Sequence, residues 1–326
     1  MNEPTPQLDL AAASELVGKI RTEIRKVLIG QEDVIDQVLV ALFAAGHVLI
    51  EGVPGLGKTL LVRSLARTFG GETSRIQFTP DLMPADVVGH VVYEIQTGEM
   101  KLRRGPVFTN LLLADEVNRA PAKTQAALLE VMQEHQVTLE GSSLGVPNPF
   151  MVLATQNPIE LEGTYPLPEA QLDRFLMKIQ IEYPHEHDEL ELIRTVTQGR
   201  VGDGLRTDEV GRVTDAAGIA AIQGVAAGLR VEPRVSDYAV RIARTTRTWA
   251  GVALGAGPRG GIALVRAARG RALLSGRTFV TPDDVKSVAR PALRHRILLS
   301  PEIELEGQRA DDVLEAVLKH VEAPRE

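Results

Sequence analysis

One short segment constrains the fold more than any other part of the chain. Residues 52–59 read Gly-Val-Pro-Gly-Leu-Gly-Lys-Thr, which matches the pattern G-x-x-x-x-G-K-T at every fixed position. The apolar run 47–50 directly before it predicts a buried strand, and residues 60–69 after it predict a helix that ends at Gly70. The segment is therefore expected to be the loop of a strand–loop–helix unit.

A glycine-rich loop in this position is suited to binding phosphate. Its glycines let backbone N–H groups converge on phosphate oxygens, while Lys58 neutralises the β- and γ-phosphates and the Thr59 hydroxyl can bind Mg²⁺. A chance glycine-rich turn is the alternative, but it does not account for the flanking strand and helix. We therefore expect ATP and Mg²⁺ as ligands. The expected nucleotide contacts are Gly52, Pro54, Gly55, Leu56, Gly57, Lys58, Thr59 and Leu60.

A pair of carboxylates follows the apolar run 111–114. Because ligands of open α/β sheets bind at the carboxyl ends of the strands, Asp115 and Glu116 are expected at the ligand-binding edge. Asp115 can hold Mg²⁺ through its water shell, and Glu116 can polarise the water that attacks the γ-phosphorus. An isolated Asp-Glu pair is more often a solvated strand end or a helix cap. The catalytic interpretation therefore depends on the phosphate-binding loop.

Three other polar residues have both a functional and a plain structural interpretation. Asn157 follows the run 151–154 and can orient the attacking water, or it can simply form a turn with the proline after it. Arg174 and Arg259 can act on a nucleotide, or each can be surface charge paired with an acid such as Asp173. Their own patterns leave these alternatives open.

Short apolar runs alternate with helical segments along the first part of the chain, which predicts an α/β fold with a parallel sheet covered by helices. Two hairpins are expected to interrupt it. The first joins residues 91–93 to 100–103 through Thr97-Gly98, and the second joins 136–139 to 144–146 through Gly141-Ser142.

The length of 326 residues predicts two domains. Residues 1–13 are expected to form a flexible arm, residues 14–200 an ATP-binding core, and residues 201–326 a helical region. A glycine-rich stretch, 199–204, predicts a linker between the last two. Thr281-Pro282-Asp283-Asp284 predicts a helix start in the second region.

Composition excludes several classes of function. The chain has no cysteine, so disulfides, thiolate zinc sites and cysteine nucleophiles are ruled out. The net charge of −7 and the pI near 5.6 make nucleic acid an unlikely partner. No run predicts a membrane span, and the first residues do not resemble a secretory signal, so a cytoplasmic location is expected. We assign no metal site to residues 185–188, which read as an acidic helix start.

Taken together, the motifs resemble the MoxR family of AAA+ ATPases over nearly the whole chain. The similarity includes the phosphate-binding loop and residues 28–31, 114–120, 155–158, 166–175, 257–259 and 276–285. It implies a P-loop AAA+ core with a five-stranded parallel sheet, followed by an all-helical lid. It also implies a ring, expected to be a hexamer, with ATP bound between subunits.

The resemblance assigns roles to individual residues. Ile29 and Gly30 would lie near adenine, Asn157 would be sensor 1, Arg174 the arginine finger and Arg259 sensor 2. The first hairpin would be the insertion in helix 2 and the second the hairpin before sensor 1, both facing the pore. The family usually has serine and alanine beside the sensor 2 Pro-Arg, whereas this chain has Gly257 and Gly260 there.

The function expected from the resemblance is chaperone-like: ATP hydrolysis would drive remodelling, maturation or activation of a protein complex, with a von Willebrand A domain protein as a possible partner. A DNA or RNA motor of the MCM kind and a chelatase-like subunit for metal insertion are the alternatives. A nucleotide-binding scaffold without turnover is disfavoured, because the chain retains every group that hydrolysis requires.

Overall fold

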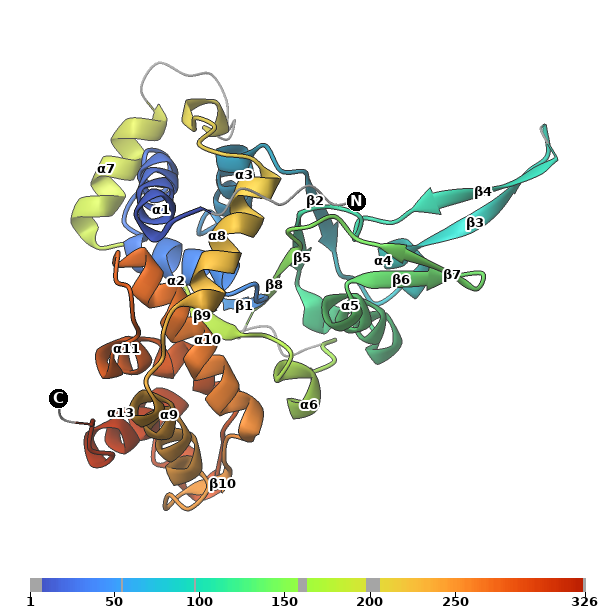
Figure 1. The fold of residues 1–326 in the computed structure, drawn as a ribbon. Coiled ribbons are helices and arrows are strands. Elements are labelled where there is room, and N and C mark those ends of the chain that lie inside the picture. Colours follow the sequence, from blue (N-terminus) through green and yellow to red (C-terminus); the bar gives the residue numbers. More distant parts are fainter. Residues whose placement is uncertain (1–7, 54, 97, 158–162, 198–205, 325–326) are drawn as a thin grey trace.

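A computed structural model of the protein describes residues 8–53, 55–96, 98–157, 163–197 and 206–324. A sheet with helices forms the first part, and a mainly helical region forms the second (Figure 1). The expected linker at 199–204 lies outside the described residues. Helix α1, Leu10–Arg25, begins inside the expected arm, because Asp9 caps it by accepting a hydrogen bond from the N–H of Ala12.

The centre of the first part is a five-stranded, fully parallel sheet, as expected. Its order is β2-β5-β8-β1-β9. The strands are β1 (Val48–Glu51), β2 (Thr73–Gln77), β5 (Leu111–Asp115), β8 (Met151–Gln156) and β9 (Met177–Gln180). Continuous apolar runs form the inner strands because both faces of the sheet are buried.

Alternate strand residues contribute to two separate hydrophobic clusters, one on each face of the sheet. Leu112 packs in the cluster with helix α5 (Ala122–Glu134), while Leu111 and Leu113 pack in the other with α1, α2 (Glu32–Phe43) and α3 (Lys58–Phe69). Shorter helices connect the strands. They are α4 (Pro84–Val88), η1 (Val117–Arg119) and α6 (Glu169–Leu172), and α7 (Glu186–Thr197) follows β9.

Both predicted hairpins are present. Strands β3 (Gly89–Glu94) and β4 (Glu99–Arg104) form the first, which projects away from the body in Figure 1. Strands β6 (Gln136–Leu139) and β7 (Ser142–Gly145) form the second. Its turn is Glu140-Gly141, one residue earlier than predicted, and both residues have positive φ as a tight hairpin turn requires.

The C-terminal region is helical, as expected, and contains in addition one pair of short strands, β10 (Val252–Leu254) and β11 (Leu298–Leu299). Its other elements are η2 (Thr207–Glu209), α8 (Ala216–Gly228), α9 (Pro233–Thr246), α10 (Pro258–Leu274), α11 (Pro282–Leu293), α12 (Pro301–Leu305) and α13 (Ala310–His320). The predicted start of α11 is confirmed, since Thr281 caps the N–H of Asp284.

This helical region does not sit apart from the sheet. Its buried residues belong to the same hydrophobic cluster as α1, α2 and α3. Helix α10 packs so closely on α2 at Gly270 that a Cβ there would lie 2.6 Å from the carbonyl oxygen of Val40. The two expected domains therefore share one core in this structure.

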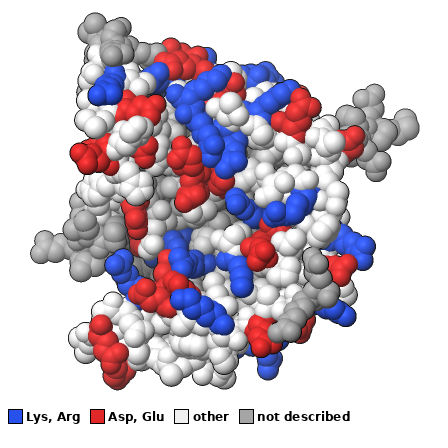
Figure 2. Space-filling model, turned by 90° about the vertical axis from the view of Figure 1, so that its left-hand side faces the viewer, with Lys and Arg blue, Asp and Glu red and all other residues white. Residues whose placement is uncertain are grey.

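Lysine, arginine and acidic side chains are interspersed on the face that lies to the left in Figure 1, and neither sign dominates it (Figure 2). Within the described ranges, no helix is long and apolar enough to span a membrane.

The fully buried His47 makes fold stability depend on pH. Its Nε2 donates to the carbonyl of Met132 and its Nδ1 accepts from the N–H of Val152, so the ring is neutral. Burial lowers the pKa of His47 from 6.5 to about 4. The unfolded chain therefore takes up a proton first as pH falls from 6.5 to about 4, and the native state loses up to about 3 kcal/mol.

Denaturant unfolding at pH 7, 6, 5 and 4.5 measures this loss. His47→Gln cannot be protonated, so its free energy of unfolding should fall less steeply with pH than that of the wild type, even if it is lower throughout. Equal slopes in the two proteins would contradict the assignment.

Candidate functional site

The phosphate-binding loop borders a cavity of about 330 Å³ at the carboxyl edge of the sheet. The cavity is lined by Gly52, Gly55, Gly57, Lys58, Thr59, Leu60, Arg75, Gln77, Asp115, Glu116, Thr155 and Asn157. Most of the predicted site residues are thus brought together, from three segments of the chain, and a fourth segment adds Arg75 and Gln77. Leu56 is buried and does not line the cavity, and Pro54 lies outside the described residues.

The loop has the conformation that phosphate binding requires. Gly55 and Gly57 have φ of 88° and 74°, and Gly57 is the N-cap of α3. The unpaired N–H groups of the first turn of α3 can therefore face an anion in the cavity. The Lys58 ammonium donates to the carbonyl of Gly52 at 2.7 Å. Burial lowers the pKa of Lys58, and Asp115 and Glu116 oppose that shift.

Thr155 bonds to both residues of the acid pair, to the carboxylate of Asp115 and to the backbone of Glu116. Its buried hydroxyl donates to Asp115 Oδ1 at 2.7 Å and accepts from the N–H of Glu116 at 2.9 Å. Glu116 has a φ of 54°, a left-handed conformation that is uncommon for a side chain other than glycine. Thr155 was not predicted, because only the pairing of β5 with β8 brings it to Asp115.

Two arginines pair with these carboxylates. Arg75 approaches Asp115 Oδ2 with Nε at 2.9 Å and with a terminal nitrogen at 2.7 Å. Arg119 Nε lies 2.9 Å from Glu116 Oε2. Neither was singled out from the sequence. Arg75 has no local signal, since β2 and β5 are distant along the chain, but Arg119 is three residues from Glu116 and helical spacing could have indicated it.

A second cavity, of about 380 Å³, lies beside Gly30. Helix α2 and the start of α7 line it, and a Cβ at Gly30 would lie 2.6 Å from the Cβ of Asp188. The Gln31 amide donates to the carbonyl of Leu56 at 3.1 Å, which ties this segment to the loop. Ile29 is next to this cavity in sequence but does not line it.

Arg174 and Arg259 do not line the phosphate-binding cavity. They lie together in a different cavity of about 330 Å³, between the start of β1 and helix α10. No residue lines both cavities. The Arg174 side chain makes no hydrogen bond or ion pair within the described ranges, and Arg259 Nε lies 3.8 Å from Asp173 Oδ2.

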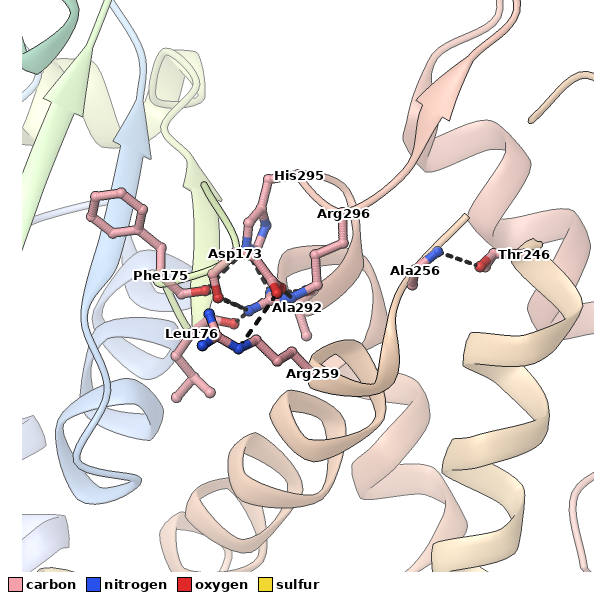
Figure 3. Close-up of polar contacts among 9 residues, drawn as sticks. All are labelled: Asp173, Phe175, Leu176, Thr246, Ala256, Arg259, Ala292, His295 and Arg296. Carbon is pink, nitrogen blue, oxygen red and sulfur yellow. Dashed lines mark hydrogen bonds and ion pairs between the residues drawn. The ribbon is translucent and has the colours of Figure 1, made fainter. Parts of the chain in front are cut away.

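Arg296 fixes the segment that carries Arg174 (Figure 3). Its guanidinium, almost entirely buried, pairs with Asp173 Oδ1 at 2.7 Å and donates to the carbonyl of Phe175 at the same distance. Burial lowers the pKa of Arg296, and Asp173 opposes that shift. No local sequence pattern indicates Arg296, because its partner Asp173 lies 123 positions away.

The chain matches two family models. Residues 47–177 match the ATPase family associated with various cellular activities, AAA, and residues 244–317 match the AAA lid domain.

Similar proteins extend the match to almost the whole chain. Chaperone MoxR1 of Mycobacterium tuberculosis is 42% identical over 97% of this chain and 84% of its own length. Protein MoxR of Methylorubrum extorquens is 33% identical over 95% of this chain and 96% of its own. The crystal structure of an ATPase candidate from Cytophaga hutchinsonii superposes with a TM-score of 0.89, at 39% identity and with 97% of each chain covered. The chain therefore belongs to the MoxR family of AAA+ ATPases.

Proposed function

We propose that the protein hydrolyses ATP with Mg²⁺ in a homo-oligomeric ring and uses the energy to remodel a protein complex. The observation that carries the proposal is the cavity at the carboxyl edge of the sheet. It combines a phosphate-binding loop with Lys58, two carboxylates and an amide, from separate strand ends. This set supplies groups for binding, for proton transfer and for orienting water.

The loop side of the cavity binds the nucleotide in this proposal. The N–H groups of the loop and the Lys58 ammonium hold the β- and γ-phosphates. Thr59 and Asp115 offer a hydroxyl and a carboxylate in one cavity, and such oxygen donors fit Mg²⁺. Bound Mg²⁺ would neutralise charge that develops on the phosphates. Gly30 and Ile29 are assigned to the adenine side, which is supported by the hydrogen bond between Gln31 and Leu56.

The opposite side of the cavity activates water. Water attacks the γ-phosphorus, the bond from that phosphorus to the bridging oxygen of ADP breaks, and Glu116 accepts the proton that the water loses. Asn157 orients the water. Thr155 is a positioning residue, because its hydroxyl holds the Asp115 carboxylate and the backbone of Glu116.

Arg174 and Arg259 act across a subunit boundary in this proposal. Both are outside the phosphate-binding cavity of their own chain, in one cavity with each other. A neighbouring copy can bring both guanidinium groups to the γ-phosphate. A ring of such contacts, expected to be a hexamer, then contains one nucleotide at each boundary.

The remodelling role is supported by the relative named Chaperone MoxR1. The client is expected to be a protein complex in the cytoplasm, with a von Willebrand A domain protein as an expected partner. A nucleic-acid motor is disfavoured by the net charge of −7 and by the mixed charges of the face in Figure 2. A chelatase-like role has weaker support, since a magnesium-chelatase 38 kDa subunit from Acidiphilium rubrum is 31% identical over 66% of this chain.

Two substitutions should separate binding from hydrolysis. Lys58→Ala removes the cation that faces the phosphates and should abolish ATP binding in equilibrium titrations. Glu116→Gln keeps the shape of the side chain but cannot accept a proton, so it should bind ATP and release no phosphate. Normal ATP affinity in the first variant, or normal turnover in the second, would contradict these roles.

The positioning role of Thr155 can be tested with a nearly isosteric pair of variants. Thr155→Val keeps the volume but loses the hydroxyl bonded to Asp115 and Glu116, so kcat should fall about 10- to 100-fold while the Kd for ATP changes little. Thr155→Ser retains the hydroxyl and should recover most of the rate. If both variants lost activity equally, packing rather than the hydroxyl would be responsible.

Arg174→Ala should bind ATP but hydrolyse it poorly, because arginine fingers contribute on the order of 10³–10⁵ in rate where they have been measured. Mixing it with the inactive Lys58→Ala variant should restore phosphate release. In a mixed ring, an intact loop of the first variant meets an intact Arg174 of the second.

Mixed rings must first be shown, by co-purification of two differently tagged variants. A role for Arg174 in trans is excluded if verified mixed rings are no more active than their parents, or if Arg174→Ala alone has the normal rate.

A further inference from the structure

A groove of about 530 Å³ runs between helices α9 and α10. Apolar side chains form its floor, and two of them, Val240 and Ile262, are 48% and 57% exposed. Four arginines surround them, and no acidic residue of the described segments lines the groove. These arginines are Arg244, Arg247, Arg266 and Arg269. The groove is therefore both apolar and positively charged.

None of the four arginines is neutralised by a carboxylate in the described part of the chain. Arg247 donates to the carbonyl of Ala256, and Arg266 donates to the carbonyls of two α2–β1 loop residues. Arg244 makes no hydrogen bond or ion pair, and the buried Nε of Arg269 has no acceptor. The rim can therefore take an acidic partner without breaking an existing ion pair.

Helix α7 has the complementary chemistry. None of its twelve residues is buried. Leu190, Ile193 and Val196 are 49%, 54% and 43% exposed, and their spacing of three residues places them on one face of the helix. Glu186 and Glu189 lie on the same face, toward its N-terminus, and among the described residues neither is in an ion pair. A 12-residue helix with an exposed apolar stripe is stabilised by covering that stripe.

Within one chain, α7 does not cover the groove, because α7 lies in the upper half of Figure 1 whereas α9 and α10 lie in its lower half. We propose that the groove binds α7 of a second copy of this chain. The apolar stripe of α7 packs on Val240 and Ile262, and Glu186 and Glu189 face the arginine rim. Such a contact joins different surfaces of the two copies and can therefore build a ring.

Both surfaces continue the boundary proposed above, and this step rests on the proposed function. The groove shares Ile262 and Arg266 with the cavity that contains Arg174. Helix α7 begins at the cavity beside Gly30, and Gln31 of that cavity is hydrogen-bonded to Leu56 of the phosphate-binding loop. In the proposed ring, one copy brings its Arg174 to the nucleotide of its neighbour. The groove of the first copy then lies near α7 of that neighbour.

Cross-linking tests the contact directly, because the natural chain contains no cysteine. A chain with both Ile193→Cys and Ile262→Cys, treated with a short bismaleimide, should give a ladder of linked subunits. Each single-cysteine chain should stay monomeric in denaturing gels. The matched control joins Ile193→Cys to Leu305→Cys, which is 89% exposed on α12, and should give no ladder. An absent ladder, or an equal one in the control, overturns the proposal.

A charge exchange tests the predicted ion pairs between α7 of one copy and the arginines of the groove in the other. Glu189→Arg and Arg244→Glu should each raise the concentration needed for assembly about tenfold, measured by analytical ultracentrifugation, and the double variant should recover most of the loss. Arg234→Glu makes the same charge change on α9 outside the groove and should have little effect. The contact is contradicted if the single variants assemble normally, or if the double variant does not recover assembly.

The results also separate this inference from the proposed function. If the ladder fails while Arg174 and Lys58 variants still complement each other, the ring exists and uses other surfaces, so only the α7 contact is wrong. If the protein does not assemble at all, both the contact and the ring are wrong.

Discussion

The structure depends on the burial of both faces of one parallel sheet. Successive side chains of β1, β5 and β8 enter two hydrophobic clusters in turn, so these strands cannot carry polar groups along their length. Polar side chains are confined to the strand ends. At the carboxyl edge they bond to one another, as when Glu51 at the end of β1 accepts from Gln156 at the end of β8 at 2.7 Å. The clustering of chemical groups at this edge is therefore a consequence of how the core is built.

The buried ion pair between Arg296 and Asp173 has a comparable importance for the other cavity. Arg296 follows α11, whereas Asp173 precedes Arg174 in the segment leading to β9. The same Asp173 carboxylate also approaches Arg259 at the start of α10. One acid thus connects the α6–β9 segment to two points of the helical region. Arg174 and Arg259 are therefore held in one cavity, because the segment and the helical region share both this acid and one hydrophobic cluster.

The sequence predicted what local patterns determine. The strand–loop–helix unit, the three inner strands and both hairpins were found because continuous apolar runs, glycines and helix caps act over a few residues. The number of five strands came from the family resemblance. Thr155, Arg75 and Arg296 were missed, because each is defined by a partner at least 40 positions away. The second turn was displaced by one residue, since Glu140 adopts a left-handed conformation that glycine usually occupies. The short strands β10 and β11 were missed because runs of two or three residues carry no periodicity.

Charge balance gives an independent reason for a neighbour to complete the site. Lys58 and Arg75 offset Asp115 and Glu116 among the charged residues that line the phosphate-binding cavity, so this set is neutral before a ligand enters. ATP remains negatively charged even when Mg²⁺ is bound, and a neutral cavity closed by another subunit would bury that charge without compensation. Arg174 and Arg259 supply two positive charges from a single cavity. In the proposed ring, the arginines of one subunit are attracted by the nucleotide of the next, and the charge of the nucleotide is neutralised only where two subunits meet. Subunit contact and nucleotide binding therefore stabilise each other.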